Sequence, residues 1–146
     1  MTDSKSLADL HPHVRDMATR FELEATSAGV PFAVTFTLRS MERQAELYAQ
    51  GRTAPGRVVT NARAGYSFHN YGLALDVVPL ELLRLPDWGD NPHDQARANV
   101  LWAKLAAIGK AIGFRWGGDF HLIKDRPHFE WSGALTLADL RAGKRP

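Results

Sequence analysis

The sequence predicts an α+β fold in which helices pack on a small, mainly antiparallel sheet. Both halves of the chain contain segments with apolar residues three and four positions apart, as in a helix, and shorter apolar segments between them have the patterns of strands. With 146 residues, of which 45% are hydrophobic, the chain has the size and composition of a globular domain. We therefore expect residues 1–146 to form a single domain around one core.

The first predicted helix carries apolar residues on one face and ends at Gly29. The residues that recur at steps of three and four are Leu7, Leu10, Val14, Met17 and Phe21. A second helix follows Ser40, a favoured N-cap residue, and runs to about Gln50, where Gly51 stops it.

A third predicted helix extends from about Asp94 to Ile112 and ends at Gly113. Its apolar face consists of Leu101, Leu105, Ile108 and Ile112. A short last helix is expected after Thr136, because Thr136 and Asp139, three residues later, have the pattern of a capping box.

Four segments have the patterns of strands. Residues 32–38 alternate, and the side chains on the face expected to be buried are Phe32, Val34, Phe36 and Leu38. Residues 73–78 are apolar except for Asp76, which is typical of a buried strand, and residues 114–116 form a short strand. The last strand follows Pro127, and its alternation puts three polar side chains on one face: His128, Glu130 and Ser132.

Two segments without periodicity are expected to be loops, residues 52–66 and 79–93. The first leads directly to His69, and long loops in compact domains are usually functional, so we expect it to form a wall of a cleft. The net charge is only +2, but residues 52–63 and 141–146 are locally basic and could attract anionic polymers such as murein or phospholipid headgroups.

Asp76 is the first residue to indicate chemistry, because a carboxylate in a buried strand is costly unless it is paired, hydrogen-bonded or bound to a metal. With His69 and His128 it completes a set of two imidazoles and one carboxylate, the ligand set of a catalytic zinc with one position left for water. The chain has no cysteine, on which closed structural zinc sites usually depend. A salt bridge is the alternative explanation for Asp76.

Asp125 is the candidate general base. It lies three residues before His128, across a turn stiffened by Pro127, and can thus stand beside a metal without binding it. The alternatives are that Asp125 caps the turn or pairs with a nearby cation, of which Lys124, Arg126 and Arg39 are candidates.

The pattern Ser67-x-His69-x-x-Gly72-x-Ala74-x-Asp76 resembles the signature of the zinc D-Ala-D-Ala carboxypeptidase and L-Ala-D-Glu endopeptidase family, the LAS-type murein peptidases that include VanX and VanY. Asp125-x-x-His128 resembles the second motif of that family. The similarity covers most of the chain, from about Leu10 to Trp131. It is greatest to the L-alanyl-D-glutamate endopeptidase branch, which includes phage endolysins, because that branch typically has Asp where VanX dipeptidases have Glu. The chain departs from its relatives in lacking a Gly before Leu38 and Arg39.

The resemblance implies a LAS/Hedgehog-like zinc peptidase fold and a Zn²⁺ ion held by His69, Asp76 and His128. It further implies that Asp125 is the catalytic base and that Arg39 stabilises the oxyanion together with zinc. The implied substrate is the peptidoglycan stem peptide, cut between L-Ala and D-Glu. The substrate contacts that we expect are Ser67, Arg52 and Asn70.

Two other functions are compatible with the sequence. One is a D,D-carboxypeptidase of the same family, which would release terminal D-Ala. The other is a zinc-stabilised cell-wall binding module without catalysis, because Hedgehog domains resemble the family in fold. The presence of Asp125, Arg39 and a ligand set with an open position argues against such a module.

Residues 1–9 do not have the pattern of a signal peptide, and no apolar run reaches the length of a membrane span. Together with the small size of the chain and its family resemblance, this leads us to expect a monomeric endolysin, from a phage or prophage of a Gram-negative host, that accumulates in the host cytoplasm. It would reach the cell wall in the periplasm after membrane permeabilisation, by a holin or a similar lesion. No motif suggests nucleic-acid binding, and we expect no membrane insertion.

Overall fold

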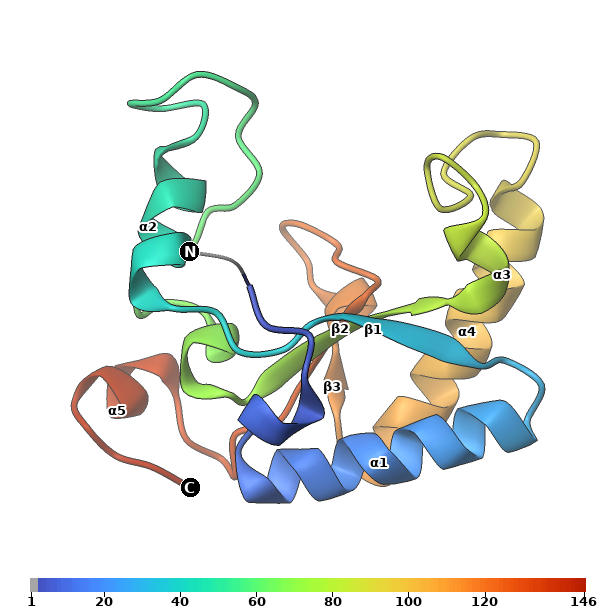
Figure 1. Cartoon of the computed structure of the whole chain (residues 1–146), viewed down its shortest axis with the longest axis horizontal. Helices are drawn as coiled ribbons and strands as arrows, with labels where there is room; N and C mark the ends of the chain where they lie inside the picture. Colours follow the sequence, from blue (N-terminus) through green and yellow to red (C-terminus); the bar gives the residue numbers. More distant parts are fainter. Residues whose placement is uncertain (1–2) are drawn as a thin grey trace.

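A computed structural model describes residues 3–146 (Figure 1). Its sheet has four strands in the order β1-β2-β4-β3, and every neighbouring pair is antiparallel. The strands are β1 (Phe32–Phe36), β2 (Ala74–Pro79), β3 (Arg115–Trp116) and β4 (His128–Glu130). The α+β fold with a small antiparallel sheet, predicted from the sequence, is confirmed.

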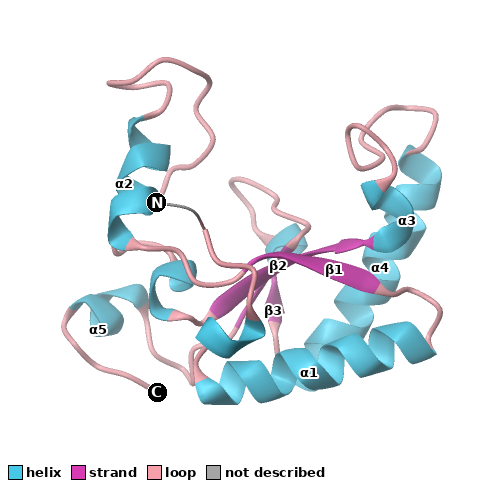
Figure 2. Cartoon of the chain, in the orientation of Figure 1, coloured by secondary structure: helices cyan, strands magenta, loops and turns pink. Residues whose placement is uncertain are grey.

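The helices lie below this sheet and at its two ends (Figure 2). They are α1 (Pro12–Ser27), α2 (Met41–Ala49), α3 (Leu80–Leu83), α4 (Gln95–Ile112) and α5 (Leu137–Arg141), with 3-10 turns η1 (Leu7–Asp9), η2 (Phe68–Tyr71) and η3 (Gly117–Asp119). The two long helices, α1 and α4, pack against each other, and α1 runs below the sheet in Figure 2. None of the helices in residues 3–146 is both long and apolar enough to cross a membrane.

The core lies between the two long helices and the sheet. Phe21 of α1 contacts Phe129 of β4, with ring centroids 4.9 Å apart. Helix α4 approaches the same ring so closely that a Cβ atom at Gly109 would stand 2.6 Å from Phe129. Since side chains alternate across a strand, the burial of Phe129 in this core sends His128 and Glu130 to the opposite face.

The first helix starts later than its apolar pattern predicts. It begins at Pro12, and His11 is its N-cap, whose ring Nδ1 accepts from the amide of His13. Proline favours the first helical position and keeps the residue before it extended, which separates α1 from the preceding turn η1. Leu10 is nevertheless buried, so the apolar pattern identified core residues but not the helix boundary.

Strand β1 also differs from the predicted alternation. A bulge between Val34 and Phe36 inserts one residue into its pairing with β2. Because one extra residue exchanges the two faces of a strand, Thr37 is buried and Leu38 is 36% exposed, the reverse of the prediction.

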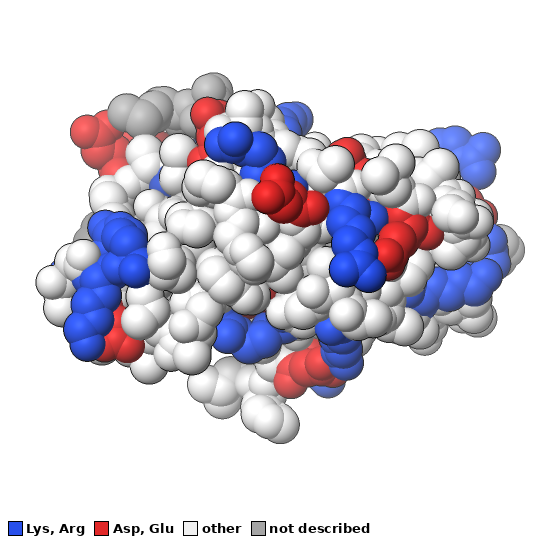
Figure 3. All heavy atoms as spheres, turned by 90° about the horizontal axis from the view of Figure 1, so that it is seen from below, with Lys and Arg blue, Asp and Glu red and all other residues white. Residues whose placement is uncertain are grey.

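Charged side chains of both signs are mixed on the side of the molecule where α1 lies. Figure 3 shows Lys and Arg next to Asp and Glu over this face. Helix α1 contains one ion pair of this kind, between Arg20 and Glu24. Such a surface agrees with the small net charge of the chain.

Candidate active site

Three elements bring the predicted metal ligands together. His69 lies in η2, whose N-cap Ser67 accepts a hydrogen bond from the His69 amide. Asp76 lies in β2 and His128 in β4, and the antiparallel register places these two residues directly opposite each other. The sheet therefore fixes two of the side chains, and a capped turn brings the third to them.

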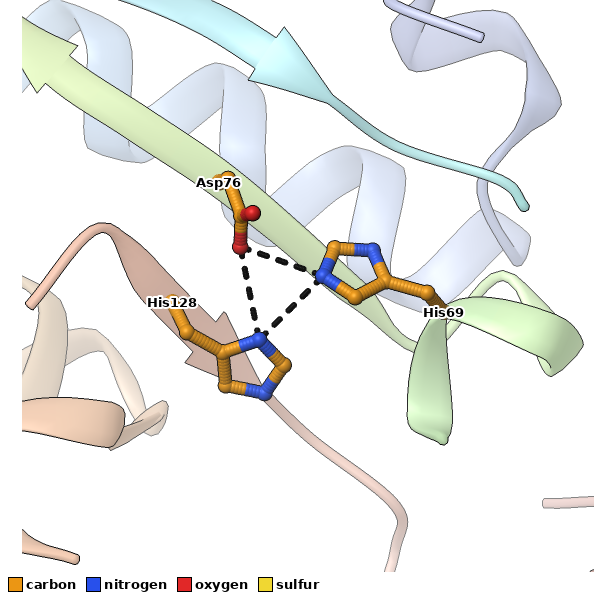
Figure 4. Close-up of side chains that lie close together, drawn as sticks. All are labelled: His69, Asp76 and His128. Atoms are coloured by element: carbon orange, nitrogen blue, oxygen red, sulfur yellow. Dashed lines mark hydrogen bonds and ion pairs between the residues drawn. The ribbon is translucent and has the colours of Figure 1, made fainter. Parts of the chain in front are cut away.

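The donor atoms of the three side chains form a nearly equilateral triangle (Figure 4). His69 Nε2 is 3.1 Å from Asp76 Oδ1 and 3.2 Å from His128 Nδ1, and the remaining edge, between Asp76 Oδ1 and His128 Nδ1, is 3.3 Å. A tetrahedral zinc with bonds of 2.0–2.1 Å has ligand atoms about 3.3 Å apart. The observed triangle fits one face of such a tetrahedron.

The outer nitrogens of both imidazoles are engaged elsewhere. His69 Nδ1 donates to the carbonyl oxygen of Thr37 at 2.7 Å, and His128 Nε2 donates to Glu130 Oε1 at 2.8 Å. In the neutral rings these contacts leave lone pairs on the two nitrogens that face Asp76. Two lone pairs and a carboxylate directed at one point are suited to a cation, so these residues fit zinc.

Without a metal ion, the charges of a protonated His128 and an ionised Asp76 hold the three side chains together. Burial disfavours the charge on His128, but hydrogen bonds and charges from Asp76 and Glu130 outweigh it and raise its pKa to about 10. Burial likewise opposes the charge on Asp76, and the two imidazoles more than offset it, so the pKa of Asp76 lies well below its usual range.

We predict that zinc uptake releases a proton from His128. The ring is protonated below a pKa of about 10, and zinc must displace that proton, so apparent affinity should fall as the pH falls. The expected slope is about one logarithmic unit per pH unit between about pH 7 and 8.5. Titration calorimetry in buffers of different ionisation enthalpy measures the released protons, and heats independent of the buffer would contradict the prediction.

Asp125 lies at the edge of the triangle, with Oδ2 3.9 Å from His128 Nδ1, and its side chain is 47% exposed. Burial, followed by the negative charge of Asp76, raises the pKa of Asp125 above its usual range. The amide of Asp125 donates to the carbonyl oxygen of Gly117, where a Cβ would stand 2.2 Å from the Asp125 carbonyl oxygen. A glycine at position 117 therefore allows the turn that places the side chain of Asp125 beside the triangle.

Arg39 lines the same cleft as the triangle and Asp125. Its Nε donates to Asp3 Oδ1 at 3.0 Å and its Nη1 to Gln44 Oε1 at 3.3 Å. Gln44 is fully buried and also donates to the carbonyl oxygen of Ala62, in the loop that walls the cleft. Asp3 and Gln44 thus hold one edge of the Arg39 guanidinium in place. Neither residue was identified from the sequence.

The three expected substrate contacts have different positions. Ser67 lines the cleft, whereas Arg52 and Asn70 are not among the lining residues. Arg52 donates to the carbonyl oxygens of Tyr48 and Thr60 and so holds the loop of residues 52–66 in shape. The Asn70 side chain donates to the carbonyl oxygen of Arg39 and accepts from the amide of Gly65, so its polar atoms are engaged by the backbone.

The cleft over the triangle has a volume of about 640 Å³. A second hollow, of about 630 Å³, adjoins it and shares Tyr66, Phe120 and Asp125 with its lining. This hollow, which we call the side groove, runs between the loop of residues 52–66 and residues 119–125. Leu122, at 98% exposure, and the half-exposed Ile123 and Val59 form its apolar border.

Comparisons with known proteins identify the family. Residues 60–131 match a peptidase M15 family described as D-alanyl-D-alanine carboxypeptidase. The chain is 39% identical over 123 residues to the peptidoglycan L-alanyl-D-glutamate endopeptidase CwlK of Bacillus subtilis (strain 168), covering 84% of this chain and 74% of that protein. The chain belongs to the peptidase M15 family. The resemblance noted from its two motifs is confirmed.

Two further relatives of this M15 chain cover most of its length. The L-alanyl-D-glutamate peptidase of Listeria phage A118 is 28% identical over 132 residues, which are 88% of this chain but 41% of the phage protein. The crystal structure of the L-Ala D-Glu endopeptidase ChiX of Serratia marcescens matches with a TM-score of 0.54 and 25% identity, over 95% of this chain and 92% of that one.

Proposed function

We propose that this M15 peptidase hydrolyses the peptidoglycan stem peptide between L-Ala and D-Glu, using a zinc ion held by His69, Asp76 and His128. The observation that carries the proposal is the triangle of donor atoms with edges of 3.1–3.3 Å, open to a cleft in which Asp125 stands beside it. The choice of bond is supported by the names of CwlK, the phage peptidase and ChiX.

Zinc in such a site lowers the pKa of water toward about 7 and polarises a carbonyl group. Asp125 takes the proton from the attacking water and returns it to the leaving amine. Its raised pKa suits this exchange, since a general base works best near the operating pH. The guanidinium of Arg39, held by Asp3 and Gln44, stabilises the oxyanion that forms at the scissile carbonyl.

The side groove favours endopeptidase over D,D-carboxypeptidase action. An enzyme that cuts within a chain must accommodate substrate on both sides of the scissile bond, whereas one that removes a terminal residue needs space mainly on one side. Here the cleft over the triangle continues past Asp125 and Phe120 into a second hollow of similar volume. A non-catalytic wall-binding module, in turn, would have no use for Asp125 beside the metal ligands.

Leu122→Ser should raise the KM for murein about fivefold and leave kcat nearly unchanged. The side chain borders the side groove at 98% exposure, and losing part of its contact with substrate removes about 1 kcal/mol of binding. Leu23→Ser is the matched control, because Leu23 is 69% exposed on α1 and lies outside the groove. Equal KM values for the two variants would exclude a role of the side groove.

Mass spectrometry of purified murein digested with the zinc-loaded protein tests the function. A new N-terminal D-Glu on the released peptides, with L-Ala left on the glycan, is the expected result. Release of free D-Ala would establish the D,D-carboxypeptidase instead. Murein that is bound but not cut by the zinc-loaded protein would establish the wall-binding module.

The biological role that fits this chemistry is that of an endolysin. The similarity to a phage peptidase supports such a role. We propose that the protein acts as a monomer, collects in the host cytoplasm and reaches the wall in the periplasm once a holin or a similar lesion opens the membrane. Lysis of cells that express the protein together with a holin, and not of cells that express it alone, is the expected result.

A further inference from the structure

The structure contains a buried carboxylate that the proposed mechanism does not use. Glu130 lies two residues after His128 in β4, on the same face, and its side chain is only 7% exposed. A carboxylate buried to this extent is costly unless its oxygens are hydrogen-bonded or paired with a cation. The contacts of Glu130 show which groups satisfy it.

The two oxygens of Glu130 have different partners. Oε1 accepts from His128 Nε2 at 2.8 Å, on the side of the ring that faces away from the triangle. Oε2 accepts from Nη2 of Arg115 at 2.8 Å and from its Nε at 3.1 Å. Glu130 thus connects a metal-ligand imidazole to a guanidinium that is half exposed at the surface.

The sheet register fixes this chain of contacts. Arg115 of β3 is the direct cross-strand partner of Glu130, so the ion pair forms between facing residues. Arg115 also donates to Ser132 Oγ at 3.0 Å, and its guanidinium lies over the ring of Phe68, the neighbour of His69. Glu130 is therefore held in place independently of His128.

The two imidazoles of the triangle are oriented by unlike groups. His69 Nδ1 donates to a neutral backbone carbonyl, whereas His128 Nε2 donates to a carboxylate. A carboxylate that accepts from the outer nitrogen of a ligand histidine fixes its tautomer and orientation and makes the inner nitrogen a stronger donor to the metal. His128 should accordingly be the more strongly donating of the two rings.

We propose that Glu130, braced by Arg115, is a positioning residue that sets the zinc affinity of the site by orienting His128 Nδ1 toward Asp76 and His69. The inference rests on the proposed function in taking the triangle as the zinc site. It adds a residue pair that acts through His128 and does not itself touch metal or substrate. The competing explanation is that Glu130 and Arg115 form an ion pair that serves the fold alone.

Glu130→Gln keeps the size of the side chain and removes its charge. We expect the zinc dissociation constant, measured by competition with a chromophoric chelator, to rise about 10- to 100-fold. The matched control is Glu81→Gln, which likewise removes the charge of a glutamate paired with an arginine, Arg97, but outside the cleft. The control should bind zinc as tightly as the wild type.

Cobalt(II) substituted for zinc supplies a readout that an effect on the fold alone would not change. Its visible absorption bands should shift in Glu130→Gln, because the bands report ligand geometry, and remain in place in Glu81→Gln. Unchanged zinc affinity and unchanged bands in Glu130→Gln would overturn the inference. If Glu130→Gln fails to fold, Arg115→Ala replaces it, because the side chain of Arg115 is half exposed and the fold should tolerate its loss. Weaker zinc binding by Arg115→Ala supports the inference, and unchanged binding overturns it.

This test is independent of the proposed reaction. A wild type that binds zinc but leaves murein uncut would contradict the proposed function, while the affinity comparison would still decide the role of Glu130. Equal affinities of wild type and Glu130→Gln, with murein cut normally, would contradict only the role of Glu130.

Discussion

Asp125→Asn is expected to lower kcat on murein by a factor of about 100 to 10,000. The amide has nearly the shape of the carboxylate but cannot accept the proton from water or return it to the leaving amine. Zinc affinity should be unchanged, because Asp125 is not one of the three proposed ligands. Its Oδ2 lies 3.9 Å from His128 Nδ1, farther than the three donor atoms lie from one another. Release of new amino termini from a soluble muropeptide measures kcat, and chelator competition measures zinc binding.

The same variant distinguishes an enzyme from a binding module. If the protein is an enzyme, Asp125→Asn loses turnover and keeps its binding to purified walls. A variant that cuts murein at the wild-type rate would show that another group transfers the proton, and Asp125 would then be a turn residue, as its amide contact with Gly117 allows.

Asp76→Asn is the second change with a large expected effect. The apparent free energy of zinc binding in structural sites is about 10–16 kcal/mol, or roughly 3–4 kcal/mol per ligand, so zinc affinity should fall about 100- to 1,000-fold. The loss should exceed that for Glu130→Gln, because Asp76 supplies a corner of the triangle itself.

Asp16→Asn, at an exposed position of α1, is the control for this loss of charge. Turnover of Asp76→Asn should be absent when zinc is equimolar with the protein and should return in part at high zinc concentration. If Asp76→Asn bound zinc as tightly as Asp16→Asn, Asp76 would be only the ion-pair partner of the two histidines and not a ligand.

The clustering of the three candidate ligands could be predicted from the sequence, because Asp76 and His128 stand in patterns that limit their surroundings. Asp76 interrupts an apolar run, so its burial and its need for a partner follow from the sequence alone. His128 starts a strand whose alternation with Phe129 determines the side of the sheet on which it lies. In the structure the side chain of Asp76 is only 14% exposed and pairs with both imidazoles, while Phe129 lies in the core and His128 stands opposite Asp76.

The groups that orient these ligands could not be predicted in the same way. The carbonyl oxygen of Thr37 accepts from His69, and its position depends on the bulge in β1, which no residue pattern predicts. Gln44 is a lone polar residue on the buried side of α2, where the sequence gives no reason to place it against Arg39. Glu130 could be placed on the same strand face as His128 from the alternation, but its pairing with Arg115 depends on the register of β3 and β4.

The prediction of helix boundaries and of short helices failed for local reasons. The apolar period of the first helix extends across Pro12, although the proline and its N-cap start the helix there. Helix α3, with the buried Leu82, lies within residues 79–93, which lack enough length between prolines to show a period. Arg52 and Asn70, which we expected to contact substrate, are near cleft residues in the sequence. Their side chains instead donate hydrogen bonds to backbone carbonyl oxygens near the cleft.

Anomalous diffraction at the zinc absorption edge, from crystals of the protein with equimolar zinc, tests the central claim most directly. We expect one strong peak about 2.0–2.1 Å from each of His69 Nε2 and His128 Nδ1 and at a similar distance from Asp76 Oδ1. A peak at other side chains, with the triangle left without zinc, would contradict it.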